Sequence, residues 1–147
     1  MAKTFKHGVH PADNKHWTQH LPLQRLPFVF DKFVVPLHQN LGGPSKAIVE
    51  VGQRVKRGQV IAAPGGFVSV AHHAPVTGTV TAIAPRRHPF GHLAQAIEIR
   101  TDAYDPQIFE GEGSIDWASL SDKDFLSHVQ NAGLVGMGGA AFPSHVK

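Results

Sequence analysis

The stretch Val49-Glu-Val-Gly-Gln-Arg-Val-Lys-Arg-Gly-Gln-Val-Ile-Ala62 decides the fold of this chain of 147 residues. Its short runs of β-branched residues are separated by the pairs Gly52-Gln53 and Gly58-Gln59. Glycine favours tight turns there, because it adopts backbone conformations that other residues avoid. The stretch therefore predicts short strands joined by close turns.

Similar β-branched and aromatic runs continue on both sides of this stretch. Together they predict a mainly β domain, a sandwich or barrel, over residues 34–101. The expected strands lie at 28–30, 33–35, 47–51, from Val55, and at 60–62, 67–70, 79–83 and 95–99.

The flanking segments differ in composition. Residues 1–33 are rich in proline and weakly periodic, which predicts an extended N-terminal arm. We expect Trp17, Phe28 and Phe33 to anchor this arm. Residues 102–147 begin with a polar loop at 102–113 and a short helical turn at 114–120.

A C-terminal helix is expected to follow that turn. Ser121 is expected to cap its first turn, with Asp124 three residues later, and Gly133 occupies the position of a C-terminal helix cap. Asp122 and Asp124 complement the positive end of the helix dipole.

Composition excludes several classes of function. The formal net charge is only +3 and the basic residues are dispersed, so nucleic-acid binding is not expected. The chain has no cysteine and therefore supplies no disulfide and no thiolate ligand to zinc or an iron–sulfur cluster. No apolar run reaches the ~18 residues of a membrane span, and no signal peptide is recognisable at the N-terminus.

The eleven histidines raise the question of a metal site. His72 and His73 are adjacent and would point to opposite faces of a strand. His88 and His92 are separated by Pro89 and Gly91, which argues against a helical ligand pair. We therefore expect no metal site. Ser69 and His72 could form a nucleophile and base, but no orienting acid or oxyanion loop accompanies them, so no catalytic residue is assigned.

The opening stretch resembles the hairpin of biotinyl and lipoyl domains, V-x-x-G-D-x-V-x-x-G-Q-x-L/I. Ala74-Pro-Val-Thr-Gly-Thr-Val80 resembles the A-P-x-x-G-x-V hairpin of the same fold. The resemblance implies a barrel-sandwich hybrid, in which Val51, Val55 and Ile61 would point into the core. The carrier function does not follow, because residues 63–73 contain no lysine that could take a cofactor.

Three further segments resemble the C subunit of the Rnf electron-transport complex. Residues 8–15 are similar to its opening G-x-H-P-x-x-N-K motif, and residues 35–44 to its P-L-x-Q-H-x-G-x-P segment, with His38 and Gln39 in altered order. Gly133-Leu-Val-Gly-Met-Gly-Gly-Ala-Ala-Phe-Pro143 is similar to the flavin loop G-[LI]-x-G-x-G-G-A-G-F-P. That loop is shared with the NADH-binding subunit of respiratory complex I.

The resemblance implies a longer parent protein. Its members have a β-rich N-terminal domain, an α/β domain that binds FMN and NADH, and a cysteine-rich module with two [4Fe–4S] clusters. Electrons pass between NADH and ferredoxin, coupled to ion movement by membrane subunits. We therefore expect this chain to be the N-terminal part of such a subunit, with a truncated FMN- and NADH-binding domain at 102–147.

The resemblance also implies site residues, partners and a location. Gly136, Gly138, Gly139 and Lys147 would contact FMN in the parent, because glycine amides and a lysine ammonium suit a phosphate. Met137 and Ala141 depart from the flavin-loop pattern, where complex I often has arginine and glycine. The expected partners are the other subunits, including a ferredoxin-like one, at the cytoplasmic face of the inner membrane.

In this setting the β domain would be a scaffold and docking element. We expect the chain alone to bind neither FMN nor NADH and to be inactive. Two alternatives remain open from the sequence. The chain could be a protein-interaction module that uses the biotinyl-like fold without a carrier lysine. It could also belong to the A subunit of the sodium-translocating NADH:quinone oxidoreductase, which shares this architecture.

Overall fold

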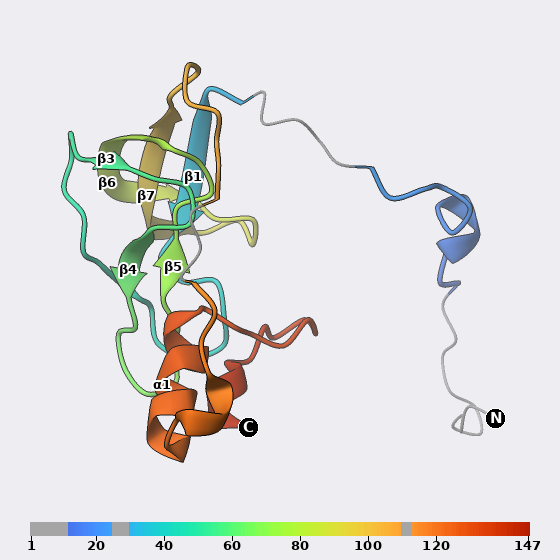
Figure 1. Cartoon of the computed structure of the whole chain (residues 1–147). Helices are drawn as coiled ribbons and strands as arrows, with labels where there is room; N and C mark the ends of the chain where they lie inside the picture. The colour runs from blue at the N-terminus through green and yellow to red at the C-terminus, as the bar shows by residue number, and fades with distance from the viewer. Residues whose placement is uncertain (1–11, 25–29, 110–112) are drawn as a thin grey trace.

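A computed structural model describes residues 12–24, 30–109 and 113–147. Two antiparallel sheets form its β part (Figure 1). The larger sheet has the order β1-β7-β6-β3, with β1 at Lys32–Pro36, β3 at Arg54–Val55, β6 at Gly78–Arg87 and β7 at Leu93–Thr101. The smaller has the order β2-β4-β5, with β2 at Lys46–Ala47, β4 at Val60–Ala63 and β5 at His72–His73. The expected mainly β fold is confirmed.

The long hairpin of β6 and β7 forms the centre of the larger sheet. Its pairing runs from Gly78 opposite Thr101 to Arg87 opposite Leu93, with one bulge between Val80 and Ala82. β1 adds to the outer edge of β7, so β7 is paired on both sides.

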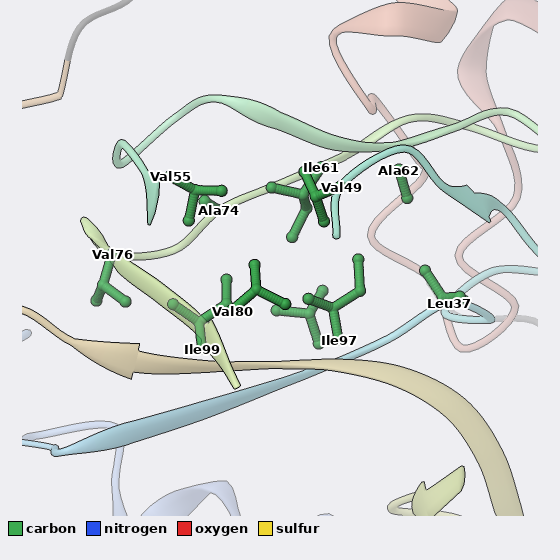
Figure 2. Packing of buried hydrophobic residues seen from close by; sticks show 11 residues of the cluster. Leu37, Val49, Val55, Ile61, Ala62, Ala74, Val76, Val80, Ile97 and Ile99 are labelled. Carbon is green, nitrogen blue, oxygen red and sulfur yellow. The ribbon is translucent and has the colours of Figure 1, made fainter. Parts of the chain in front are cut away.

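The core lies between the two sheets (Figure 2). Ile97 and Ile99 reach it from β7, and Ile61 from β4, and all three are fully buried. Val55 is also fully buried, so the expected inward orientation of Val55 and Ile61 is confirmed. Burial of β-branched and aliphatic side chains is the main favourable term in folding of such a domain.

Two glycines make the turns that the opening stretch predicts. Gly52 has φ +91° and Gly58 has φ +89°, in the left-handed region that L side chains rarely adopt. The chain reverses at both points, and the second turn leads into β4 of the smaller sheet.

Parts of the strand prediction are wrong. The strand expected at 47–51 ends at Ala47, because the chain turns at Val51 and Gly52. Val51 is consequently 62 % exposed, whereas Val49 is 6 % exposed and occupies the core.

The strand expected at 67–70 is also wrong. Residues 65–68 form a bend, and a Cβ on Gly65 would stand 1.9 Å from the carbonyl oxygen of Pro44, so only glycine fits there. The carbonyls of Phe67 and Ser69 bond to side chains of the C-terminal segment and not to a neighbouring strand.

The C-terminal segment packs below the smaller sheet (Figure 1). It contains the 3₁₀ turn η2 at Trp117–Ser119, helix α1 at Asp122–Asn131 and the 3₁₀ turn η3 at Ser144–Val146. Ser121 Oγ accepts the Asp124 N–H at 3.2 Å and Gly133 has φ +72°, so both expected caps of the helix are confirmed.

Residues 12–24 of the N-terminal segment are exposed throughout and include the 3₁₀ turn η1 at Lys15–Trp17 (Figure 1). Trp17 is 69 % exposed and its ring centroid lies 4.8 Å from that of His16, while Phe33 lies in β1 against the core. Phe28 and most of the strand expected at 28–30 lie outside the described residues. No helix among the described residues has the length and apolar character needed to cross a bilayer.

Candidate functional site

The glycine-rich loop that follows α1 closes on itself. Val135 and Pro143 form an antiparallel bridge, and the Gly136 N–H donates to the Phe142 carbonyl at 2.8 Å. Inside this closure, the Ala141 N–H donates to the Gly138 carbonyl at 3.0 Å. These bonds give the loop a defined shape that leaves its tip, residues 137–140, exposed.

Two glycines at the tip have room around them. A Cβ built on Gly138 or Gly139 would meet nothing within 4 Å, and neither residue has a left-handed φ. Packing within the described part of the chain therefore does not require glycine at either position. Their N–H groups bond to no other described residue, which leaves two backbone donors available to a ligand.

Lys147 lies over the base of the loop. Its Nζ would be 2.9 Å from a Cβ on Gly136, so Gly136 allows the lysine to approach the backbone closely. Lys147 makes no ion pair with a described residue. The structure thus brings Gly136 and Lys147 together, and sets Gly138 and Gly139 at the adjacent exposed tip.

Ala141 has a strained backbone. Its φ is +44°, in the left-handed region, at the position where the flavin-loop pattern has glycine. An alanine can adopt this conformation at a cost of about 1–2 kcal/mol. The left-handed turn that glycine would favour is therefore kept despite the substitution.

Three contacts tie the segment around the loop to the β domain. The Leu41 N–H donates to the Ala140 carbonyl at 2.9 Å. His145 Nε2 donates to the Phe67 carbonyl at 2.7 Å, and Gln130 Nε2 donates to the Ser69 carbonyl at 3.0 Å. None of these contacts could be predicted from the sequence, because each joins residues far apart along the chain and involves no local pattern.

A hollow of about 410 Å³ lies beside these contacts, where the β domain and the loop meet. Val35 and His72 line it on one side, and Gly133 and Ala141 on the other. Asn40 Oδ1 has no hydrogen-bond donor among the described residues, although Asn40 lines the hollow and is only 7 % exposed. This volume is within the range of small-molecule sites.

The Ser69 and His72 pair does not form a catalytic arrangement. Ser45 lies between them, with its Oγ 3.4 Å from Ser69 Oγ and 3.3 Å from His72 Nε2. Gln39 Nε2 donates to His72 Nδ1 at 3.3 Å, which leaves the proton of the neutral ring on Nε2. Burial is the main cause that lowers the pKa of His72. The three buried side chains form a structural network without an acid.

The other histidines do not gather into a metal site. His88 and His92 stack with their ring centroids 4.8 Å apart. Within the described residues, no three histidine, aspartate or glutamate side chains are close enough to hold one ion. The two rings therefore stabilise the turn between β6 and β7, in which they lie.

The fold and its two glycine turns agree with a known protein family. The profile of a family described as the RnfC barrel sandwich hybrid domain matches residues 3–104. The chain belongs to the RnfC family. The barrel-sandwich hybrid implied by the two glycine hairpins is thereby confirmed, and the family match favours the Rnf interpretation of the sequence over the two alternatives.

Members of the RnfC family are similar along the whole chain. It is 41 % identical over 147 residues to the C subunit of the proton-translocating ferredoxin:NAD(+) oxidoreductase complex of Clostridium ljungdahlii. It is 40 % identical over 145 residues to the C subunit of the ion-translocating oxidoreductase complex of Pseudomonas aeruginosa. It is 38 % identical over 152 residues to the C subunit of the Na(+)-translocating ferredoxin:NAD(+) oxidoreductase complex of Acetobacterium woodii.

These alignments cover 97–100 % of this chain but only 18–32 % of the relatives. The chain thus spans about a third or less of their length. The names of two relatives differ in the coupling ion, which is a proton in one and Na⁺ in the other.

Proposed function

We propose that this chain is the N-terminal part of an electron-transfer subunit in a membrane-bound, ion-translocating NADH:ferredoxin oxidoreductase. The names of the three relatives support the class of complex. The observation that carries the proposal for this chain is the tip of the glycine loop. It presents two N–H groups, on Gly138 and Gly139, that bond to no other described residue, and Lys147, which pairs with no described acid, lies at Gly136 in the base of the same loop.

These residues fit the phosphate of FMN. Two adjacent backbone N–H groups can donate to one phosphate, and a lysine ammonium adds a point charge of opposite sign. The chemistry that a bound FMN would supply at this site is hydride acceptance and one-electron transfer. Lys147 would hold the phosphate, and the absence of Cβ atoms on Gly138 and Gly139 would let it approach the backbone.

The β domain acts as the scaffold of this site. Its contacts from Leu41, Phe67 and Ser69 hold the C-terminal segment on both sides of the loop. In the whole subunit, an α/β domain would complete the FMN and NADH site and a cysteine-rich module would hold two [4Fe–4S] clusters. The 147 residues include no cysteine, so they contribute no thiolate ligand to these clusters.

The proposed partners are the other subunits of the complex, among them a ferredoxin-like one. The proposed location is the cytoplasmic face of the inner membrane. We further propose that this chain alone does not oxidise NADH with an artificial acceptor. Turnover by the purified 147-residue polypeptide would contradict that proposal.

The flavin content of the full-length subunit tests the site. Gly138→Ala adds a methyl group in open space, so folding should be unaffected while the phosphate is obstructed. Gly43→Ala is a matched control, because a Cβ on Gly43 also meets nothing within 4 Å. We expect Gly138→Ala to reduce bound FMN at least tenfold and Gly43→Ala to leave it unchanged. Equal flavin content in both variants would overturn the assignment.

A second variant tests whether the charge of Lys147 contributes to FMN binding. Lys147→Gln removes the positive charge and should weaken the binding of FMN about tenfold or more, since a charge-assisted hydrogen bond contributes about 1.5–3 kcal/mol. Riboflavin, which has no phosphate, should bind the wild type and the variant equally. An equal loss for riboflavin would show that Lys147 acts on the fold and not on the phosphate.

A further inference from the structure

Charge is distributed very unevenly along the chain. Residues 32–101 contain eight lysines and arginines but only two acids, Glu50 and Glu98. Residues 102–147 contain two lysines and seven acids. The overall charge of +3 therefore conceals a basic β domain joined to an acidic segment, and a domain of net positive charge attracts anionic partners.

The turn between β6 and β7 protrudes from this basic domain (Figure 1, yellow). The His88 N–H donates to the His92 carbonyl and the Gly91 N–H to the His88 carbonyl, each at 2.8 Å. Gly91 has φ +88°, which completes a tight reversal. The turn is thus closed by its own backbone.

His88 fixes this turn to the neighbouring loop. Its Nδ1 accepts the Phe90 N–H at 3.2 Å, so Nε2 carries the proton and donates to the His38 carbonyl at 3.1 Å. His88 is only 8 % exposed, and His92 stacks on its ring. A buried histidine therefore holds the turn in one conformation.

The fixed turn presents apolar side chains to solvent. Phe90 is 82 % exposed and Leu93 is 72 % exposed, although an exposed turn has no structural need for either. The Phe90 ring lies beside that of His88, with 5.1 Å between the two centroids. The hydrogen-bonded turn at residues 88–93 thus holds the exposed side chains of Phe90 and Leu93 in fixed positions.

One exposed cation, Arg87, lies at the base of this turn, and Glu98, farther along β7, is paired. The sequence has no aspartate or glutamate between Glu50 and Glu98. Glu98 is held by Arg86 at 3.0 Å and by Lys32 at 3.6 Å, and the hydrogen bond from Arg86 is the main cause that lowers the pKa of Glu98. Arg87 is exposed at the base of the turn and forms no ion pair with a described residue.

We propose that the β6–β7 turn, with Phe90 beyond the strand ends and the paired residues Arg87 and Leu93 at its base, inserts into the surface of an anionic lipid bilayer. The two apolar side chains would enter the interfacial layer, and Arg87 would bind lipid phosphate. This inference rests on the proposed role of the β domain in docking the subunit at the membrane complex.

The shape of the turn favours lipid over a protein partner. A stable protein interface buries about 800 Å² on each side with many complementary contacts. A protruding turn of a few residues provides much less, and its unpaired charge has one sign. Interfacial binding needs only a small apolar insertion together with basic residues near anionic headgroups, and such attraction acts within about 10 Å.

Co-sedimentation of the 147-residue chain with vesicles tests this proposal. The vesicles consist of phosphatidylcholine with about 30 % phosphatidylglycerol, or of phosphatidylcholine alone. We expect binding to the anionic vesicles only, and we expect it to weaken at about 0.5 M salt, because the Debye length there is well below 10 Å. Phe90→Ser should reduce partitioning about tenfold, and Arg87→Gln about fivefold.

Two matched controls separate insertion from general effects. Tyr104→Ser removes a fully exposed aromatic ring next to Asp102 and Asp105, and Arg100→Gln removes an exposed cation at the far end of β7. Both variants should bind as the wild type does. Because the chain has no cysteine, a polarity-sensitive dye can be placed at Phe90→Cys or Tyr104→Cys alone. Only the dye at position 90 should report an apolar environment on the vesicles.

The outcomes against the proposal are distinct. An equal loss of vesicle binding in Phe90→Ser and Tyr104→Ser would show that the chain adsorbs by charge without insertion and would overturn the proposal. The absence of a dye response at position 90 would do the same. Binding only to membranes that contain the other subunits would overturn it in favour of a protein partner. Since these vesicles contain no other subunit and no flavin, failure here leaves the proposed electron-transfer function untouched.

Discussion

The replacement of Val55 by alanine tests the architecture of the β domain. Val55 lies in β3 and is fully buried in the core, whereas Val51, four residues earlier, is 62 % exposed in the turn. The resemblance to the biotinyl and lipoyl hairpin implies that both side chains point inside. Val55→Ala and Val51→Ala are therefore a matched pair, in which the chemical change is the same and only the structural environment differs.

The expected difference follows from burial. Removal of two methyl groups from a fully buried site loses about 1.6 kcal/mol of transfer free energy at ~0.8 kcal/mol each. The cavity left behind raises the loss to about 2–3 kcal/mol. At Val51 most of this area already contacts water, so the change in the free energy of unfolding should stay within about 0.5 kcal/mol.

Thermal and urea denaturation, followed by circular dichroism, measure both variants. We expect Val55→Ala to lower Tm by ~5–10 °C and Val51→Ala by less than ~2 °C. An unchanged urea m-value would confirm that both variants unfold from a similar native state. Equal destabilisation of the two variants, or a larger loss at Val51, would refute the orientation of the opening stretch.

Three further predictions concern the histidine network, the helix cap and the strained loop. Burial holds the pKa of His72 below 6.5 in the folded state, so the unfolded chain takes up that proton first. The free energy of unfolding should therefore fall as pH drops below about 6.5. His72→Gln should flatten this slope in urea titrations at several pH values, and an unchanged slope would contradict the assignment. Ser121→Ala should lower the free energy of unfolding by about 1 kcal/mol, because the N-terminal cap of helix α1 is lost. Amide hydrogen exchange in the first helical turn at wild-type rates would contradict this. Ala141→Gly should raise stability by about 0.5–1 kcal/mol, since relief of the positive φ outweighs the entropy of glycine; a lower Tm would disprove the strain.

Local chemistry explains what the sequence predicts correctly. Gly52 and Gly58 mark turns because their backbone conformations are rare for other residues, and the turns then set the neighbouring strands. The helix at the C-terminal end follows in the same way from Ser121 and Gly133. Each of these signals depends on residues a few positions apart, which a sequence displays directly.

Contacts between distant segments explain the errors. Residues 67–70 have strand-forming side chains, but their carbonyls bond to Gln130 and His145, which no local pattern reveals. Val51 continues an alternating pattern, yet it lies where the chain already turns. The candidate loop is recognised from its glycines, while its attachment to the β domain depends on residues that carry no motif.

The β domain of this RnfC family member is proposed to hold the loop tip at Gly138 and Gly139 ready for a flavin phosphate. A structure of the full-length subunit with FMN bound tests this claim most directly. We predict the phosphate within hydrogen-bonding distance of both N–H groups, ~2.7–3.2 Å from nitrogen to oxygen, with Lys147 beside it. A flavin phosphate bound elsewhere, with both N–H groups facing solvent, would contradict the claim.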